Sequence, residues 1–329
     1  MTDHLAIMID DNAKRFAAQP AMRVKVGESW RTISYAELGR RIDSVAKSLV
    51  DYGVKSGDMV AIFSPNCPEW TIADFAIMRA GAVSVPIYAT STAKQAEYVL
   101  TDADVSLVFV GDQAQYDKIL SCPPDPARTL RVVAFDDDTA LTGGDSVHLR
   151  DFEAAGAASS NGAEVQERMA AARPEDVATL VYTSGTTGQP KGAVITHANV
   201  FHQIHALDDR FNVGPGDSSL CFLPLSHAYE RGWSFYIFAT GAQNCYLQDP
   251  RRIAETMIEV RPSTMVSVPR LFEKIHATVV DRVDRGPAVK ARLFEWAIDV
   301  GGKYQHQRYA DESIGPILRA QHAVADRLV

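Results

Sequence analysis

The sequence of 329 residues predicts an α/β fold with two subdomains, each built on a largely parallel sheet that helices flank. Two observations carry this prediction. Short apolar runs such as 59–63 and 83–87 alternate with segments of helical periodicity such as 68–80. The apolar runs are hydrophobic at successive positions, which is typical of strands that are buried on both faces of a parallel sheet.

The elements of the first half follow from local signals. Ser34 with Glu37 three residues later has the spacing of a capping box and predicts a helix that Gly53 ends. Pro68 in a first turn and Gly81 after a last turn are the expected boundaries of a second helix. Beyond these helices, we expect strands at 59–63, 83–87 and 105–110 and a helix at 92–100.

Two loops separate the halves, an acidic one over 136–145 and one rich in Ala, Ser and Gly over 154–163. Regular patterning resumes near residue 175, so we place a boundary near residue 172, between subdomains 1–172 and 173–329. In the second subdomain we expect strands at 177–182, 193–196, 219–223, 243–247 and 264–268, and helices at 197–209, 253–260, 270–283 and from 314 onward.

Charge and composition exclude several classes of protein. With 33 basic and 41 acidic residues the formal net charge is -8, which argues against broad nucleic-acid binding. The 4 cysteines lie far apart, form no metal-binding pair and are too few for a disulfide scaffold. The sequence does not begin with a secretory signal, and no apolar stretch reaches bilayer length. We therefore expect a soluble cytoplasmic protein.

The strongest functional signal is a loop, Thr-Ser-Gly-Thr-Thr-Gly-Gln-Pro-Lys-Gly, that runs from Thr183 to Gly192 directly after a strand. Its glycines let backbone N–H groups converge on an anion, its hydroxyls can contact phosphate or Mg²⁺, and Lys191 adds a full positive charge. The loop is not a Walker A motif, because Pro190 stands where that motif needs Gly. This composition predicts a polyphosphate-binding loop.

The loop resembles the phosphate loop of the adenylate-forming enzymes, which include acyl-CoA synthetases, luciferases of the firefly type and peptide-synthetase adenylation domains. The His-x-x-Glu-Arg pattern that begins at His227, together with segment 268–275, resembles the branch of long-chain fatty acid–CoA ligases. The resemblance covers nearly the whole chain, because further family motifs occur in the same order at 33–38, 65–70, 81–86 and 223–231.

The resemblance implies ATP-dependent activation of a fatty acid to an acyl-adenylate, from which coenzyme A then displaces AMP. It implies that Lys191 and His227 are catalytic: Lys191 neutralises charge on the leaving pyrophosphate, and His227 lies where the acyl pocket meets the α-phosphate. It further implies that Thr183 helps to bind Mg²⁺. The residues expected to hold the phosphates of ATP are Thr183, Ser184, Gly185, Thr186, Thr187, Gly188 and Lys191.

The residues after His227 allow two interpretations. Tyr229, Glu230 and Arg231 line the entrance of an acyl tunnel, or Glu230 and Arg231 form a buried pair that braces the motif. The aromatic residues that follow are expected in the core rather than in a lipid pocket; they are Trp233, Phe235, Tyr236 and Phe238.

Three features of the resembled family are missing from the sequence: a Tyr-Gly-x-Thr-Glu motif with a Mg²⁺-binding Glu, a ribose-binding Asp, and a C-terminal lid domain with a catalytic Lys. We therefore expect the chain to be a fragment of a longer ligase and nearly inactive by itself. A fatty acyl-AMP ligase that loads a carrier protein and a non-catalytic nucleotide-binding or interaction module are the alternatives. Acyl chain length, peripheral membrane contact and a homodimer are left open.

Overall fold

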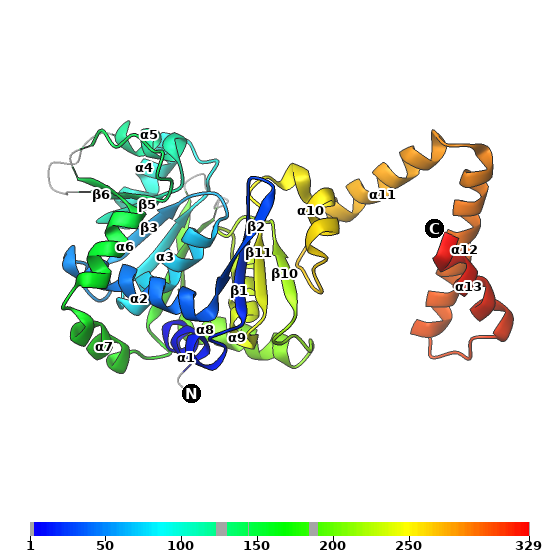
Figure 1. Ribbon diagram of the computed structural model, residues 1–329, viewed down its shortest axis with the longest axis horizontal. Coiled ribbons are helices and arrows are strands. Elements are labelled where there is room, and N and C mark those ends of the chain that lie inside the picture. The colour runs from blue at the N-terminus through cyan, green and yellow to red at the C-terminus, as the bar shows by residue number, and fades with distance from the viewer. Residues whose placement is uncertain (1–2, 123–129, 144, 184–189, 329) are drawn as a thin grey trace. The chain divides into compact units, whose positions relative to one another are not determined.

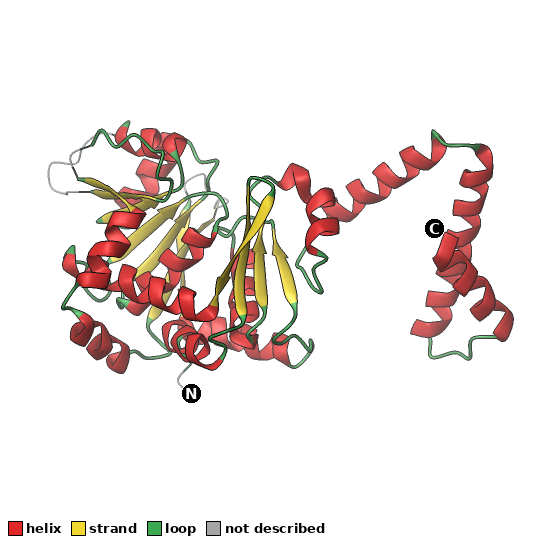
Figure 2. Ribbon diagram, in the orientation of Figure 1, coloured by secondary structure: helices red, strands yellow, loops and turns green. Residues whose placement is uncertain are grey.

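The computed structural model describes residues 3–122, 130–143, 145–183 and 190–328. The chain divides into two compact units, Met1–Val266 and Ser267–Val329. The first unit holds two sheets and the helices around them, and the second unit is helical (Figures 1 and 2). The predicted boundary near residue 172 lies within the first unit and stays a prediction. Among the described residues, no helix has the length and apolar character needed to cross a bilayer.

The larger sheet has seven strands in the order β7-β6-β5-β3-β4-β8-β9. All neighbouring strands are parallel except β8 and β9, which form an antiparallel pair at one edge. The prediction of a largely parallel sheet is therefore confirmed. The strands are β3 (Met59–Phe63), β4 (Val83–Ile87), β5 (Leu107–Val110), β6 (Arg131–Ala134), β7 (Ser146–His148), β8 (Val177–Thr183) and β9 (Lys191–Thr196).

Helices cover both faces of this sheet, as the unbroken apolar runs predict (Figure 1). Along β3, Val60 and Ile62 join a core shared with α2 and α3, whereas Ala61 and Phe63 join a second core shared with α4 and α5. Successive residues of one strand therefore pack into the two cores on opposite faces of the sheet. These helices are α2 (Tyr35–Asp51), α3 (Pro68–Arg79), α4 (Ala93–Asp102) and α5 (Gln113–Leu120).

The smaller sheet has four strands in the order β10-β11-β1-β2. Strands β10 (Ser218–Cys221) and β11 (Gln243–Tyr246) are present as predicted. The hairpin of β1 (Pro20–Val26) and β2 (Ser29–Ser34) is not among the predicted strands. The predicted strand at 264–268 is wrong, because only an isolated bridge joins Thr264 to Ser219. Further helices of the first unit are α1 (Leu5–Arg15), α8 (His197–Asp208), α9 (Ala228–Thr240) and α10 (Ile253–Val260), with a 3₁₀ turn, η1 (Pro250–Arg252).

The helix boundaries show which local signals are reliable. Ser34 caps α2 by accepting a hydrogen bond from the Glu37 N–H at 3.2 Å, as its spacing predicts. The predicted loop at 154–163 is wrong, because α6 (Leu149–Ala158) and α7 (Gly162–Ala171) fill most of it. Alanine is the best helix former, and Gly156 allows α6 to approach α2: an added Cβ would lie 1.8 Å from the Ser44 carbonyl oxygen.

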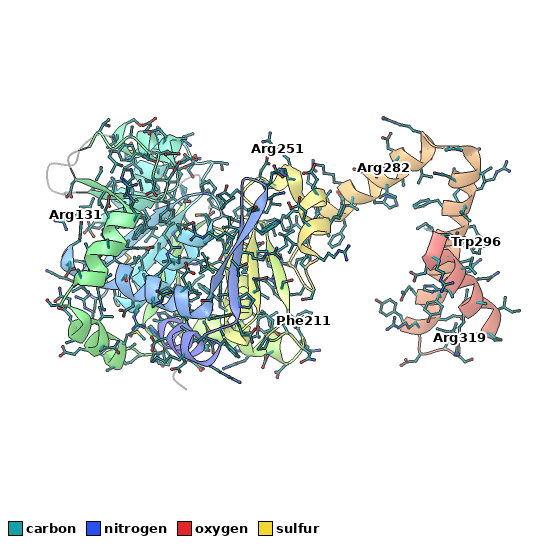
Figure 3. The ribbon with its side chains drawn as sticks, in the orientation of Figure 1. Arg131, Phe211, Arg251, Arg282, Trp296 and Arg319 are labelled. Carbon is teal, nitrogen blue, oxygen red and sulfur yellow. The ribbon has the colours of Figure 1, made fainter. Side chains whose placement is uncertain are left out.

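The second unit consists of α11 (Pro269–Asp284), α12 (Ala288–Tyr309) and α13 (Pro316–Leu328). A small core joins α12 to α13, where Trp296 and Leu318 pack around three buried residues (Figure 3). The Tyr304 ring also stacks on His322, with 3.9 Å between ring centroids. The helices predicted at 270–283 and at the end of the chain are confirmed.

Two buried histidines hold the first turn of α1. The His4 and His197 rings stack with 3.5 Å between centroids, and their Nδ1 atoms accept hydrogen bonds from the Ala6 and Leu5 N–H groups. Burial lowers the pKa of His4 to about 4, although Asp176 opposes the shift, and lowers that of His197 to about 2, with His4 and Arg231 adding to it. Both rings are therefore neutral in the folded protein at neutral pH.

This pair predicts a loss of stability in acid. Because the folded pKa values lie below the ordinary 6.5, the unfolded chain binds more protons as pH falls from 6.5 toward 4. Each histidine then lowers the free energy of unfolding by up to about 1.4 kcal/mol per pH unit.

His4→Asn keeps a side chain that can cap α1 but cannot titrate, so it should reduce this slope in urea unfolding measured from pH 7 to 4. His202→Asn, at an exposed position of α8, is the matched control and should keep the wild-type slope. Equal slopes for His4→Asn and the wild type would contradict the assignment.

Candidate functional site

The β8–β9 hairpin places two predicted site residues directly opposite each other. Thr183, the last residue of β8, pairs with Lys191, the first residue of β9, and both are exposed. Side chains of a strand alternate between faces, so Thr183 shares a face with Val181 and Thr179. Lys191 lies on the same face, because residues directly opposite each other on neighbouring strands point to the same side of the sheet. The hairpin therefore presents a hydroxyl and an ammonium group together at the open end of β8.

The opposite face of the hairpin is anchored to α4. The Tyr182 hydroxyl donates a hydrogen bond to Asp102 Oδ2 at 2.6 Å, and the Tyr98 hydroxyl donates to the Pro190 carbonyl at 3.0 Å. Burial, with added effects from the hydrogen bond to Asp102 and its charge, raises the pKa of Tyr182 above its usual range, so its hydroxyl stays a donor. The two ends of the predicted phosphate loop are thus held by packed aromatic residues.

The described part of the loop fits a polyphosphate. Lys191 has no ion-pair partner among the residues that the structure describes, so its charge is available to a ligand. The Thr183 hydroxyl is a hard oxygen ligand of the kind that Mg²⁺ accepts beside substrate phosphates. The remaining predicted phosphate contacts lie outside the described residues and stay predictions; they are Ser184, Gly185, Thr186, Thr187 and Gly188.

His227 caps the N-terminus of α9. Its Nδ1 accepts a hydrogen bond from the Tyr229 N–H at 3.2 Å, and the backbone N–H of His227 donates to the Pro224 carbonyl at 2.9 Å. Because Nδ1 acts as an acceptor, the neutral ring carries its proton on Nε2. The residue is exposed, which leaves an N–H donor at the start of α9 for a substrate oxygen.

A pocket of about 290 Å³ lies between this hairpin and helices α8 and α9. Ala228, the neighbour of His227, belongs to its lining, and Thr179, Val181 and Ile195 line it from the hairpin face that also carries Thr183 and Lys191. The rest of the lining comes from the two helices: Asn199, Val200, Gln203, Arg231, Gly232 and Phe235. The pocket is mostly apolar with a few polar groups, as expected of a small-molecule site.

Glu230 and Arg231 have separate partners. Arg231 forms a buried ion pair with Asp74 of α3 and also lines the pocket, while the tunnel-entrance interpretation stays a prediction. Glu230 is fully buried, and its Oε2 accepts a hydrogen bond from the Leu223 N–H at 3.0 Å. Its Oε1 has no partner among the described residues. The structure therefore shows no Glu230–Arg231 pair. Trp233, Tyr236 and Phe238 are buried in the core as predicted, whereas Phe235 is buried and also lines the pocket.

Asp74 is absent from the predicted site residues, although the sequence contains a signal for it. Asp74 is the single charged residue in the apolar stretch 70–78, and a carboxylate there requires a buried partner. The partner stays hidden in the sequence because Arg231 lies 157 residues away. Asn199 and Gln203, which line the pocket from α8, are missed as well.

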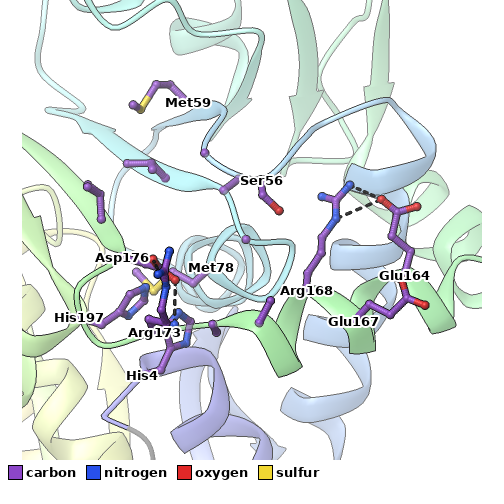
Figure 4. Close-up of a pocket in the computed structure, with 17 residues that line it drawn as sticks. His4, Ser56, Met59, Met78, Glu164, Glu167, Arg168, Arg173, Asp176 and His197 are labelled. Carbon is purple, nitrogen blue, oxygen red and sulfur yellow. Dashed lines mark hydrogen bonds and ion pairs between the residues drawn. The ribbon is translucent and has the colours of Figure 1, made fainter.

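A larger cavity, of about 800 Å³, lies elsewhere (Figure 4). It is lined by Met59, Val83 and Val177, which begin β3, β4 and β8, and therefore lies at the amino ends of these strands. Arg168 at its rim is already paired with Glu164. Since β8 is about 20 Å long, this cavity is remote from Thr183, and its size does not make it the phosphate site.

Comparison with known proteins identifies the family. Residues 9–308 match the family described as AMP-binding enzyme. The chain belongs to this family. Among curated AMP-binding enzymes, it is 33% identical to the long-chain-fatty-acid–CoA ligase FadD15 of Mycobacterium bovis, over 99% of this chain and 53% of the relative. It is 29% identical to the long-chain-fatty-acid–CoA ligase ACSBG2 of Mus musculus, over 92% of this chain and 46% of that protein.

Two solved structures share the fold. The inhibitor-bound N-terminal domain of FACL13 from Mycobacterium tuberculosis is 21% identical, with a TM-score of 0.65, over 87% of this chain and 66% of that one. ATP-bound MatB from Rhodopseudomonas palustris is 27% identical, with a TM-score of 0.67, over 83% of this chain and 51% of that one. The chain spans about half the length of the curated relatives it matches.

The buried Glu230 predicts a stability change in the opposite pH direction from the histidines. Burial raises its pKa to about 8, although hydrogen bonds from Leu223, Cys221 and Phe222 oppose the shift. A carboxyl whose folded pKa exceeds its unfolded value of 4.5 stabilises the fold below pH 4.5, and this contribution is lost as pH rises through 8.

Glu230→Gln keeps the shape of the side chain but cannot ionise. The variant should therefore lack the decrease in the free energy of unfolding that Glu230 causes as pH rises toward 8. Its free energy of unfolding should approach or exceed the wild-type value between pH 7 and 8, as measured by urea unfolding. Glu167→Gln, at an exposed position, should leave the wild-type profile unchanged. If Glu230→Gln keeps the wild-type decline, Glu230 is not its source.

Proposed function

We propose that this AMP-binding enzyme activates a fatty acid with ATP, forming an acyl-adenylate and then the coenzyme A thioester. One observation supports the proposal above all: the pocket and the Thr183–Lys191 pair occupy the same face of one hairpin, two residues apart along β8. An acid bound in this pocket has its carboxylate next to the phosphate loop. Adenylation requires this proximity of carboxylate and triphosphate.

Each described residue then has a role. The acid's carboxylate oxygen forms a bond to the α-phosphorus while the bond from that phosphorus to the pyrophosphate oxygen breaks. Lys191 neutralises negative charge that builds up on the pyrophosphate. His227 Nε2–H donates to an oxygen at the junction of acid and α-phosphate. Thr183 would help to hold Mg²⁺, which supplies further positive charge to the phosphate oxygens.

The names of the relatives support the choice of acceptor and acid. FadD15 and ACSBG2 are both named long-chain-fatty-acid–CoA ligases, which favours coenzyme A over a carrier protein and a fatty acid over other acids. The ATP-bound form of MatB supports ATP as the nucleotide. Full activity is proposed for a protein of the length of these relatives, and the chain by itself is expected to retain nucleotide and acid binding.

Removal of the Lys191 charge should weaken nucleotide binding. Lys191→Ala is expected to raise the dissociation constant of Mg²⁺-ATP about tenfold, because one charge-assisted contact to phosphate is lost. Isothermal titration calorimetry on this chain provides the measurement. Lys55→Ala, an exposed lysine that precedes the amino end of β3, is the matched control and should bind as the wild type does. Unchanged affinity for Lys191→Ala would remove Lys191 from the site.

Pyrophosphate exchange tests the reaction itself. A protein of full family length should exchange labelled pyrophosphate into ATP when palmitate is present, and His227→Ala should lower this rate on the order of 10²-fold. The variant should unfold cooperatively, which separates a site role from a folding defect. Lack of exchange with any fatty acid would reject the proposed activity, and robust exchange by the present chain alone would reject the expectation that it is nearly inactive.

A further inference from the structure

Arg231, which forms part of one wall of the pocket between β8, β9, α8 and α9, belongs to a fully buried ion pair. Arg231 lines this pocket and is 3% exposed, and Asp74, which lies behind it on α3, is 1% exposed. Arg231 Nε donates to Asp74 Oδ2 at 2.9 Å and Nη2 donates to Oδ1 at 2.5 Å. This two-point contact is the strongest geometry available to an arginine and a carboxylate.

The other groups around Arg231 hold the guanidinium in this position. Nη1 donates to the Thr179 hydroxyl at 2.6 Å, and that hydroxyl donates to the Ser84 carbonyl at 2.7 Å. The rings of Trp70 and Phe235 lie 5.4 and 5.3 Å from the central carbon of the guanidinium. The guanidinium is therefore fixed by hydrogen bonds in its plane and by aromatic contacts.

The pair makes the pocket wall electrically neutral. Arg231 is the only charged residue among the ten that line the pocket, and Asp74 compensates its charge from behind without lining the pocket itself. The apolar tail of an acid can contact such a wall at little cost in free energy. A carboxylate at the far end of the acid, in contrast, would be buried there without a cation that is free to pair with it.

The pocket runs along α9 toward this wall. Ala228, Arg231, Gly232 and Phe235 follow the spacing of one helix face, and Phe235 lies about 10.5 Å of helix rise beyond Ala228. An acid whose carboxylate lies near His227 therefore points the far end of its chain at Arg231 and Phe235.

We propose that Asp74 is a specificity-determining residue: by compensating the charge of Arg231, it restricts the pocket to acids whose far end is uncharged. This inference rests on the proposed function, because it assumes that the pocket holds the acid substrate. Asp74 acts through Arg231 and contacts no substrate. The prediction is that the protein discriminates between a monocarboxylic acid and the dicarboxylic acid of equal length.

Octanoate and suberate, the eight-carbon monoacid and diacid, test this in isothermal titration calorimetry at pH 7.5 on the present chain. The wild type should bind octanoate at least about tenfold more tightly than suberate, because suberate must bury an unpaired carboxylate. Binding of both acids within about threefold of each other would overturn the specificity inference while leaving an acid site in place. Binding of neither acid would instead reject the acid site of the proposed function.

Asp74→Asn keeps the shape of the side chain and exposes the Arg231 charge to the pocket. This variant should bind suberate with an affinity equal to or higher than that for octanoate. Asp43→Asn is the matched control, because Asp43 pairs with Arg79, another buried arginine, outside the pocket. The control should keep the wild-type preference, and loss of the preference in Asp43→Asn as well would overturn the role of Asp74.

A double variant keeps the test decisive if Asp74→Asn does not fold. Asp74→Leu with Arg231→Met replaces the ion pair by apolar side chains of similar size, an exchange that proteins often tolerate. The wall stays neutral, so octanoate should remain favoured by about tenfold or more. A double variant that binds suberate as tightly as octanoate would show that charge compensation at this wall does not set the preference.

Discussion

The pairing of β8 with β9 is the constraint on which the candidate site depends. Its register sets Thr183 opposite Lys191 and, through side-chain alternation, puts both on the face that lines the pocket. A shift of one residue in β9 would move Lys191 to the face that packs against α4. Two hydroxyl hydrogen bonds, from Tyr182 and Tyr98, oppose such a shift because they tie the loop ends to fixed points. The fold thus specifies the chemistry of the loop through strand register.

Buried polar groups connect the pocket to distant parts of the first unit. Arg231 joins α9 to Asp74 of α3 and, through Thr179, to β8 and β4. Glu230, the residue before Arg231 on α9, holds the segment before His227 through the Leu223 N–H. Such groups are costly to bury and are retained when each donor finds an acceptor. Two neighbouring residues of α9 therefore have different functions: Arg231 forms part of the pocket wall, and Glu230 fixes the loop beside the pocket.

The sequence predicts much of this arrangement and misses the rest for physical reasons. Caps and turns, such as Ser34 before α2, act locally and are readable from spacing alone. The stretch 154–163 is interpreted as a loop because it is rich in Ala, Ser and Gly, yet Gly156 is required by the contact with α2. The bridge at Thr264 has strand-like residues but no further pairing. Contacts between residues far apart in the sequence, such as Arg231 with Asp74, leave no periodic signal.

The two ends of the larger sheet differ in their ionisable groups: a pair of histidines is buried and neutral at one end, and a lysine and a histidine are exposed at the other. At the amino end of β8, neutral His4 and His197 stack under α1 and use their lone pairs for backbone N–H groups. At the carboxyl end, Lys191 and His227 are exposed. A parallel sheet gathers the loops after its strands at the carboxyl end, where polar groups can face a ligand. The cavity at the amino end is larger and is bordered by the ion pairs Arg168–Glu164 and Arg173–Asp176, whereas the smaller pocket lies on the hairpin face that carries Thr183 and Lys191.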